Sequence, residues 1–313
     1  MSEWQSVYKE RDMWLLAEIG IALAITAAPA FADDFEDGVN FLQRKDYASA
    51  ISSFRKAAAQ GDESAQHNLG LMYYNGQGVA QDYKQAASWY EKAAAQGHAS
   101  AQHNLGYMYL IGRGVAQDYS QAAFWFEKAA AQGDSSAQLN LGVMYDHGRG
   151  VAQDYKQAAS WYEKAAAQGN PAAQRALGVM YDQGQGVAQD YKQAMSWYEK
   201  AAAQGNAQAQ LNLGVMYAQG RGMSQNYKQA MLWYQKAAAQ GNARAQFDLG
   251  VMYAQRQGVP QDYVEADKWF ILAGANGYEG ASKGRVFVEK AMTRAQIAEA
   301  QRRASERLKK HGN

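Results

Sequence analysis

Two histidines at matching positions are the first residues of this sequence that suggest chemistry. His67 and His103 lie 36 residues apart, each within the segment AQHNLG. Two imidazoles on neighbouring helices could share a transition metal. No carboxylate recurs beside them at the same spacing, and His98, His147 and His311 belong to no ligand pattern. We therefore interpret the pair as solvated surface histidines and predict no metal site.

Sequence motifs for catalysis and cofactor binding are missing. There is no HExxH, no nucleophile elbow, no phosphate-binding loop and no dinucleotide-binding glycine pattern. Because the chain has no cysteine, thiolate catalysis, disulfides and cysteine-bound zinc are excluded as well. The formal charge of +1, from 31 basic and 30 acidic residues, does not favour a polyanion such as nucleic acid. The sequence thus predicts a protein that is not an enzyme and binds no cofactor.

The first 32 residues differ in composition from the rest. The apolar run at residues 19–28 and the small-x-small pattern Ala30-Phe31-Ala32 resemble a secretory signal peptide cleaved after Ala32. The run is too short for a membrane span, so we expect a periplasmic or secreted protein with no integral span after processing. Acidic residues before the run weaken this interpretation, and Met13 is an alternative start. Without a signal peptide, the protein would be cytoplasmic.

Repetition dominates the remainder of the chain. The segment WYEKAAAQG at residues 89–97 recurs at 161–169 and 197–205, with near-copies at 125–133 and 233–241. The tryptophans, the glycines after AAAQ and the Leu-Gly pairs all keep a spacing of 36 residues, and they define six units over residues 62–277. A fixed period of this length is typical of stacked helical repeats.

Each unit is predicted to contain two helices, which we call helix A and helix B. In the first unit Asp62 caps helix A, and two glycines break the chain within residues 75–81. Asp82 and Gln85 form a capping-box variant at the start of helix B, and Gly97 ends it. The tryptophan and tyrosine stripe of helix B keeps helical spacing, so we predict that it is buried between units.

A glycine inside helix A recurs in all six units, first as Gly70. Glycine costs about 1 kcal/mol relative to alanine in a helix interior, so its repetition indicates a place where another helix approaches closely. We therefore expect Gly142→Leu to disrupt packing, and replacement of Gly284, which lies outside the units, to matter much less.

One helix pair cannot bury its aromatic face alone, so the units are expected to share a continuous core. The predicted fold is all-α: a right-handed superhelical α-solenoid of stacked antiparallel helix pairs. Residues 33–61 have tetratricopeptide-like spacing with a shorter loop, and we expect them to cap one end. Residues 278–313 are predicted to form capping helices at the other end, with Thr293 and Gln296 as a capping box.

The unit ASAQHNLGYMYLIGRGVAQDYSQAAFWFEKAAAQG at residues 99–133 follows the pattern AxAQxxLGxMYxxGxGVxxDYxxAxxWYxKAAxQG. It resembles the Sel1-like repeat family, a relative of the tetratricopeptide repeats, and the resemblance covers residues 62–277. The sixth unit departs from the pattern, because Arg256 replaces a loop glycine and Pro260 is found only there. We expect a distorted loop at this point.

The resemblance implies that helix A lines the concave side of the solenoid and that the protein has an adaptor, signalling or envelope-assembly role. On a helical wheel, positions 67, 71 and 74 of the first unit point away from the core. Their equivalents are always apolar in the middle position and variable in the outer two. The predicted groove residues, none expected in the shared core, are His67, Tyr74, His103, Tyr107, Asp146, Arg175, Asp182 and Phe247. The alternative is that position 71 packs on the next unit and the outer positions vary neutrally.

The resulting hypothesis is a monomeric, non-enzymatic scaffold that holds a protein or peptide in its concave groove. An alternative comes from cysteine-rich bacterial members of the same family, which are described as β-lactam-binding or β-lactam-hydrolysing proteins. Those proteins carry a disulfide in each repeat, whereas this chain has no cysteine.

Overall fold

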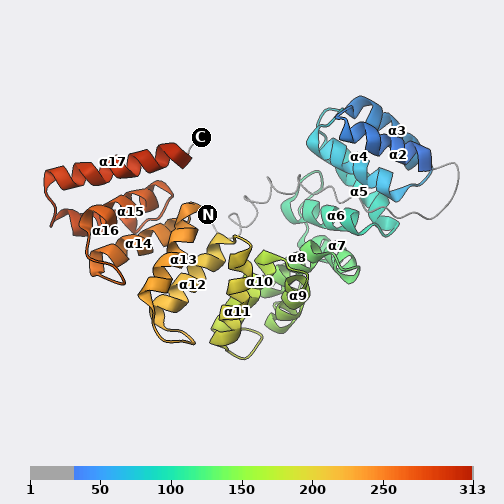
Figure 1. The fold of residues 1–313 in the computed structure, drawn as a ribbon. Coiled ribbons are helices and arrows are strands. Elements are labelled where there is room, and N and C mark those ends of the chain that lie inside the picture. Colours follow the sequence, from blue (N-terminus) through green and yellow to red (C-terminus); the bar gives the residue numbers. More distant parts are fainter. Residues whose placement is uncertain (1–31, 312–313) are drawn as a thin grey trace.

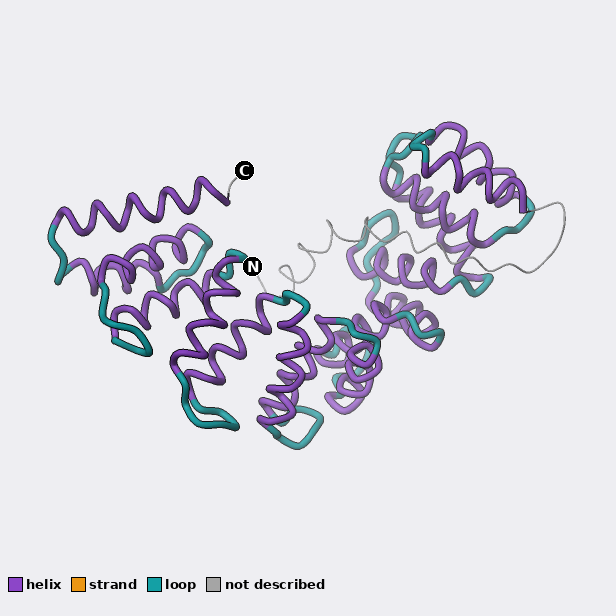
Figure 2. Tube along the Cα trace, in the orientation of Figure 1, coloured by secondary structure: helices purple, strands orange, loops and turns teal. Residues whose placement is uncertain are grey.

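The structure is a computed structural model that describes residues 32–311, and it is entirely helical over that range (Figure 1 and Figure 2). The helices are α2 (Ala32–Gln43), α3 (Tyr47–Ala59), α4 (Glu63–Asn75), α5 (Tyr83–Ala95), α6 (Ala99–Ile111), α7 (Tyr119–Ala131), α8 (Ser135–His147), α9 (Tyr155–Ala167), α10 (Pro171–Gln183), α11 (Tyr191–Ala203), α12 (Ala207–Gln219), α13 (Tyr227–Ala239), α14 (Ala243–Gln255), α15 (Tyr263–Ala275), α16 (Ala281–Glu289) and α17 (Arg294–His311).

The helices from α2 to α15 form seven pairs that stack in chain order. Each even-numbered helix packs on the odd-numbered helix that follows it, and that helix packs on the next pair. The pairs trace an arc with α2 and α3 at one end and α16 and α17 at the other (Figure 1). The predicted all-α solenoid is confirmed. The predicted signal peptide falls on residues that, apart from Ala32, lie outside the described range.

Helix boundaries follow the predicted caps, with one difference. Asp82 Oδ1 accepts the backbone N–H groups of Lys84 and Gln85 at 2.9 and 3.0 Å. The reciprocal bond predicted from the Gln85 side chain is replaced by a backbone bond, because the Asp82 N–H donates to the Tyr73 carbonyl at 2.9 Å. The packed end of helix A therefore supplies the acceptor, and the sequence prediction of a full capping box was wrong at this point.

The sixth unit keeps the loop geometry of the others. Arg256 adopts the same left-handed conformation as the loop glycines, with φ 60° against 68° at Gly76. Gln261 Nε2 donates to the Ala254 carbonyl at 2.8 Å, as Gln117 does to the Leu110 carbonyl at 2.9 Å. The expected distortion is absent, because the Arg256 backbone N–H donates to the Met252 carbonyl as the Gly76 N–H donates to the Met72 carbonyl, and neither bond requires a glycine.

The helix A glycines provide room for an aromatic ring of helix B in the same unit. A Cβ atom on Gly142 would lie 2.6 Å from Cδ1 of Tyr162, which is almost fully buried. We predicted that replacing Gly284 would matter much less. The structure contradicts this, because a Cβ on Gly284 would lie 2.9 Å from the Phe270 ring. The Phe270 ring is thus enclosed by glycines of two helices, Gly250 of α14 and Gly284 of α16.

The tryptophan and tyrosine stripe of helix B was predicted to be buried, and only part of it is. The tyrosine or phenylalanine facing each glycine is buried, but five of the six repeat tryptophans are half-buried. Each of these tryptophans packs its inner side against the core of the preceding unit. A lysine three residues later covers the ring in most units, as where Lys164 Nζ lies 3.8 Å from the Trp161 centroid. The indoles therefore join the units and face solvent through a cation–π contact.

A ladder of buried glutamines links consecutive units. Gln102 Nε2 donates to the Ala94 carbonyl of the preceding unit at 3.1 Å. Gln132, at the end of helix B, donates both to Gln102 Oε1 and to the Gly97 carbonyl at 2.8 Å. The buried rungs are Gln66, Gln102, Gln138, Gln174, Gln210 and Gln246. Because each amide is satisfied across a unit boundary, the ladder fixes how neighbouring pairs are aligned.

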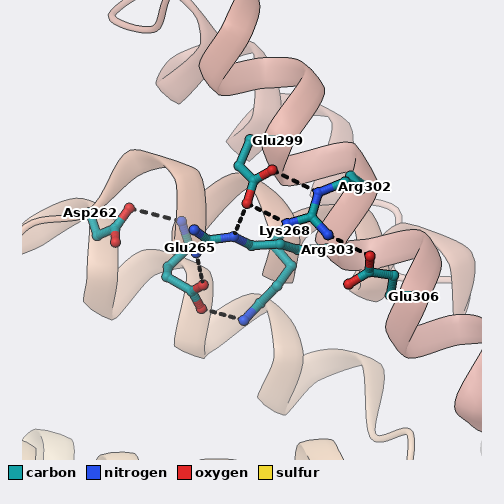
Figure 3. Close-up of polar contacts among 7 residues, drawn as sticks. All are labelled: Asp262, Glu265, Lys268, Glu299, Arg302, Arg303 and Glu306. Atoms are coloured by element: carbon teal, nitrogen blue, oxygen red, sulfur yellow. Dashed lines mark hydrogen bonds and ion pairs between the residues drawn. The ribbon is translucent and has the colours of Figure 1, made fainter.

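The C-terminal end departs from the pair pattern. Val286 of α16 occupies the helix A glycine position and is 55% exposed, because no helix B packs on it. Instead α17 lies against α15, which it contacts through Ala300 and Ala304. Ion pairs hold α17 against α15. Figure 3 shows Arg303 of α17 between Glu265 of α15 and Glu299 of α17. The predicted capping box at Thr293 and Gln296 is confirmed in both directions.

Candidate partner-binding surface

The predicted groove residues lie on helix A or at its C-terminal end, as the sequence indicated. In the middle of the arc, α8 and α10 lie toward its opening and α9 and α11 on its outer side (Figure 1). The helix A layer is thus the inner layer of the arc there. Its three variable positions, those of residues 67, 71 and 74, make different kinds of contact.

The first position packs on the buried aromatic ring of its own unit. The ring centroids of His67 and Tyr90 lie 5.8 Å apart, and those of Phe247 and Phe270 lie 5.2 Å apart. His67 also reaches the next unit, where Asn104 Nδ2 lies 3.1 Å from its Nε2. Burial, with the nearby His98 and His103, lowers the pKa of His67 to about 3. His67 is therefore a neutral packing residue at physiological pH.

Two predicted groove residues belong to the core, which corrects the prediction that none would. His103 is 5% exposed and packs on Phe126, with Asn140 Nδ2 3.2 Å from its Nε2. Tyr107 is 8% exposed and lies in the cluster around Phe126. On the helical wheel both side chains point away from Leu105, but Phe126 of the same unit and residues of the stacked next unit cover them. Truncating either residue is therefore expected to destabilise the fold.

The third position contacts the loop of the next unit. Arg113 Nη1 donates to the Tyr74 hydroxyl at 2.7 Å, and Arg221 pairs with Asp182 at 3.2 Å, each across 39 residues. Asp146 instead accepts from the Tyr162 hydroxyl at 3.4 Å, and burial raises its pKa. The sequence prediction missed these partners, two of which lie in the loop of the next unit and one on helix B of the same unit.

The middle position forms an apolar row along the inner layer. Five of its members are half-buried and pack against the core that helix B of their own unit shares with helix A of the next unit. The row ends on α16 with Phe287, which is 63% exposed. Its members are Leu71, Tyr107, Val143, Val179, Val215, Val251 and Phe287. Position 71 therefore packs on the next unit, as in the alternative interpretation, yet most of the row keeps part of its apolar surface open.

Nothing in residues 32–311 gathers three potential metal ligands, and no helix in that range is long and apolar enough to cross a membrane. Arg175, the remaining groove prediction, lies half-buried on α10. Phe287 was missed because it lies beyond the regular units, although its distance of 36 residues from Val251 was a usable signal. The inner layer thus offers a discontinuous apolar row bordered by polar groups that are mostly paired.

Comparison with known proteins explains this architecture. The model of the Sel1 repeat matches seven consecutive segments, residues 35–62, 63–98, 99–134, 135–170, 171–206, 207–242 and 243–278. This chain belongs to the Sel1 repeat family. The match includes residues 35–62, the segment predicted as a tetratricopeptide-like cap. Sel1 repeat proteins are generally protein-interaction scaffolds and typically not enzymes.

The chain is also similar to solved structures. The Sel1 repeat protein from Oxalobacter formigenes is 33% identical with a TM-score of 0.71, and the match covers 77% of this chain and 96% of that one. The protein c5321, a protective antigen of uropathogenic Escherichia coli with the same repeat fold, is 32% identical with a TM-score of 0.44, covering 89% and 76% of the two chains. No curated protein matches the sequence.

Proposed function

We propose that this Sel1 repeat protein is a non-enzymatic scaffold that holds an extended segment of a protein partner along its inner layer. The observation that carries the proposal is the apolar row from Leu71 to Phe287, which runs through every helix A of units 63–278 and ends in an exposed ring. Exposed aromatic side chains in partly enclosed surroundings are the type that most often anchors protein interfaces.

The polar groups beside the row suit a protein ligand. His67, His103, Asp146, Asp182 and Arg175 bring both signs of charge and neutral polar groups to the helix A layer, and the net charge of the whole chain is only +1. A polypeptide can match such a surface with apolar side chains and main-chain hydrogen bonds, whereas a polyanion would require a basic stripe. We therefore favour a peptide segment over nucleic acid.

Photo-crosslinking in the source organism tests the proposal. A benzoylphenylalanine replaces Phe287 or Val179 on the inner layer, and Phe124 or Ser160 on helix B serves as a matched outer position. We expect one partner protein to be crosslinked from both inner positions and from neither outer position. Crosslinking confined to the outer positions would place recognition on the other side of the arc and refute the proposal.

Affinity for the crosslinked partner gives a second measure. Phe287 and Phe124 are both exposed phenylalanines, on α16 at the position that continues the apolar row and on α7, a helix B, respectively. Phe287→Ala is expected to weaken binding about tenfold or more, because loss of an interface anchor costs about 2 kcal/mol. Phe124→Ser, which introduces the residue found at positions 88, 160 and 196, is expected to leave the affinity unchanged.

We also propose that the protein acts in the bacterial cell envelope, on the basis of the signal-like segment at residues 1–32. Cell fractionation and N-terminal sequencing of the native protein are expected to give a periplasmic chain that begins at Asp33. An intact chain beginning at Met1 or Met13 in the cytosol would contradict this location. Turnover of nitrocefin by the purified protein would instead support the β-lactam alternative.

A further inference from the structure

Three histidines meet at the junction between units 63–98 and 99–134. His67 lies on α4, His98 caps the start of α6, and His103 lies one turn into α6. The His67 and His98 rings stack with centroids 4.6 Å apart and planes inclined by 21°. His67 and His103 share one repeat position, and the described units that follow have no histidine at this position or at that of His98, where leucine, arginine, phenylalanine, asparagine, aspartate or tyrosine is found instead.

Each of these rings accepts a hydrogen bond that a protonated ring could not accept. Asn104 Nδ2 donates to His67 Nε2 at 3.1 Å, and Asn140 Nδ2 donates to His103 Nε2 at 3.2 Å. His98 Nδ1 accepts the Ala101 backbone N–H at 3.2 Å as the cap of α6. A doubly protonated imidazole is a donor at both nitrogens. Charging the junction would thus remove three acceptors and place like charges against each other.

We propose that this junction is an acid-sensitive hinge, which loosens units 63–98 and 99–134 on acidification while the later units stay closed. The proposal does not depend on the proposed partner-binding function, because it concerns the free protein. A hinge here would change how α4 and α6 present the start of the inner apolar row.

The surroundings of the three rings determine the sign of the effect. His67 is faced by His98 and His103 of α6 and by Tyr90 of α5. His98 is faced by Asp62 and Glu63, which favour its charged form, but burial has the larger effect and lowers its pKa. His103 is faced by the uncharged Phe126 of α7 and Asn140 of α8. The charges that act on His67 therefore come from the other two histidines, and they oppose its protonation.

The pH range follows from His67. Its ring takes up a proton near pH 6.5 when the chain is open but only near pH 3 in the folded junction. The junction is therefore fully stable above pH 6.5 and loses stability as the pH falls from 6.5 toward 3. Between pH 7.5 and 5.0, His67 alone is expected to raise the opening equilibrium about thirtyfold.

Hydrogen exchange of the full chain tests the hinge, with rates normalised to intrinsic exchange at each pH. From pH 7.5 to 5.0, protection of α4 and α6 is expected to fall at least tenfold, while protection of α10 and α12 in the same molecule changes less than twofold. The variant His67→Leu, His98→Asn and His103→Leu, which introduces residues found at equivalent positions of other units, should lose this difference.

The exposed His147 provides the matched control, because His147→Gln introduces the residue of positions 183, 219 and 255. This variant is expected to keep the wild-type pH response. The proposal is overturned if wild-type α4 and α6 respond no more than α10 and α12, a comparison that needs no variant. It is also overturned if the triple variant folds and keeps the response.

Discussion

The repeated units and the C-terminal end close their helix junctions in different ways. Within the units, Leu249 of α14 packs on Met231 of α13 in an apolar core. At the equivalent places of the last junction stand Arg285 of α16 and Asp267 of α15, joined at 3.0 Å. A solenoid can thus join successive units through apolar packing, as at the α13–α14 junction, and end the stack with an ion pair, as at the α15–α16 junction.

The apolar junction and the ion-pair junction differ in how they respond to salt, pH and substitution. An apolar contact of the Leu249 type is insensitive to salt and pH. The Asp267 side chain is completely buried, its Oδ2 has no hydrogen-bond partner among residues 32–311, and burial raises its pKa. A buried ion pair stabilises little more than an apolar pair would, but removing one partner leaves an uncompensated charge. The last junction is therefore specific to its partner residues and fragile to single changes.

The largest effect is expected where a helix A glycine touches a ring. Gly142→Leu should destabilise the protein by about 3 kcal/mol or more, because the first added carbon already overlaps Tyr162. Gly274→Ala in α15, where the added Cβ would lie 3.4 Å from Ala281, is expected to change stability by less than about 1 kcal/mol. Urea unfolding of both variants measures the difference, and equal stabilities would show that the glycine contact is not required.

Breaking the buried ion pair comes next in size. Arg285→Leu is expected to cost about 3 kcal/mol, because it leaves Asp267 charged and unpaired. The double variant Asp267→Met and Arg285→Leu copies the residues of the α13–α14 junction and should recover most of that loss. A double variant no more stable than the single one would mean that the two junctions are not interchangeable.

Added salt is expected to have a smaller effect, and to lower the stability of the C-terminal end more than that of the repeated units. The contact of Arg303 with Glu265 at 2.6 Å is partly exposed, as are the pairs of Arg302 with Glu299 and Glu306. Such pairs contribute about 1 kcal/mol or less and are screened by salt. Raising the salt concentration to about 0.5 M, where the screening length is only a few ångströms, is expected to lower hydrogen-exchange protection of α17 a fewfold. Protection of α8 and α9 should stay constant, and a uniform loss along the chain would contradict the comparison.

The smallest effect is expected on the outer surface. Lys164→Ala removes a cation–π contact of 3.8 Å to Trp161, which is worth about 0.5 to 1 kcal/mol at an exposed site. Thermal denaturation should show a small decrease in melting temperature, with partner affinity unchanged. A loss of affinity would move recognition to the helix B side.

The sequence was sufficient for the architecture because the evidence for it is periodic. The 36-residue spacing places the Asp82 cap, the Gly97 stop and the Gly142 contact without knowledge of neighbours. It was not sufficient for side chains whose partners lie in another unit. Tyr107 points away from the core face of a single helix but is buried once the next unit stacks on it, and Gly284 touches Phe270 from outside the period.

Contacts between units are also the part of the candidate surface that could not be predicted from the sequence. Arg113 and Tyr74 are 39 residues apart, and only the tilt between consecutive pairs brings them together. Their pairing requires the angle between units, which the hydrophobic pattern does not contain. The exposure of Phe287 depends likewise on α17 lying against α15 instead of covering α16.

The glutamine ladder has a consequence for how the gene can change. Every rung uses residues of two adjacent units only, so an exchange between near-identical repeats that removes residues 135–170 would join Asp134 to Pro171. Gln174 would then meet the Ala130 carbonyl, and Gln204 the Gly133 carbonyl, as Gln138 and Gln168 do now. Recombination in whole units therefore keeps every bond of the glutamine ladder, and the length of the inner surface is a trait that selection can adjust in single steps without redesigning the fold.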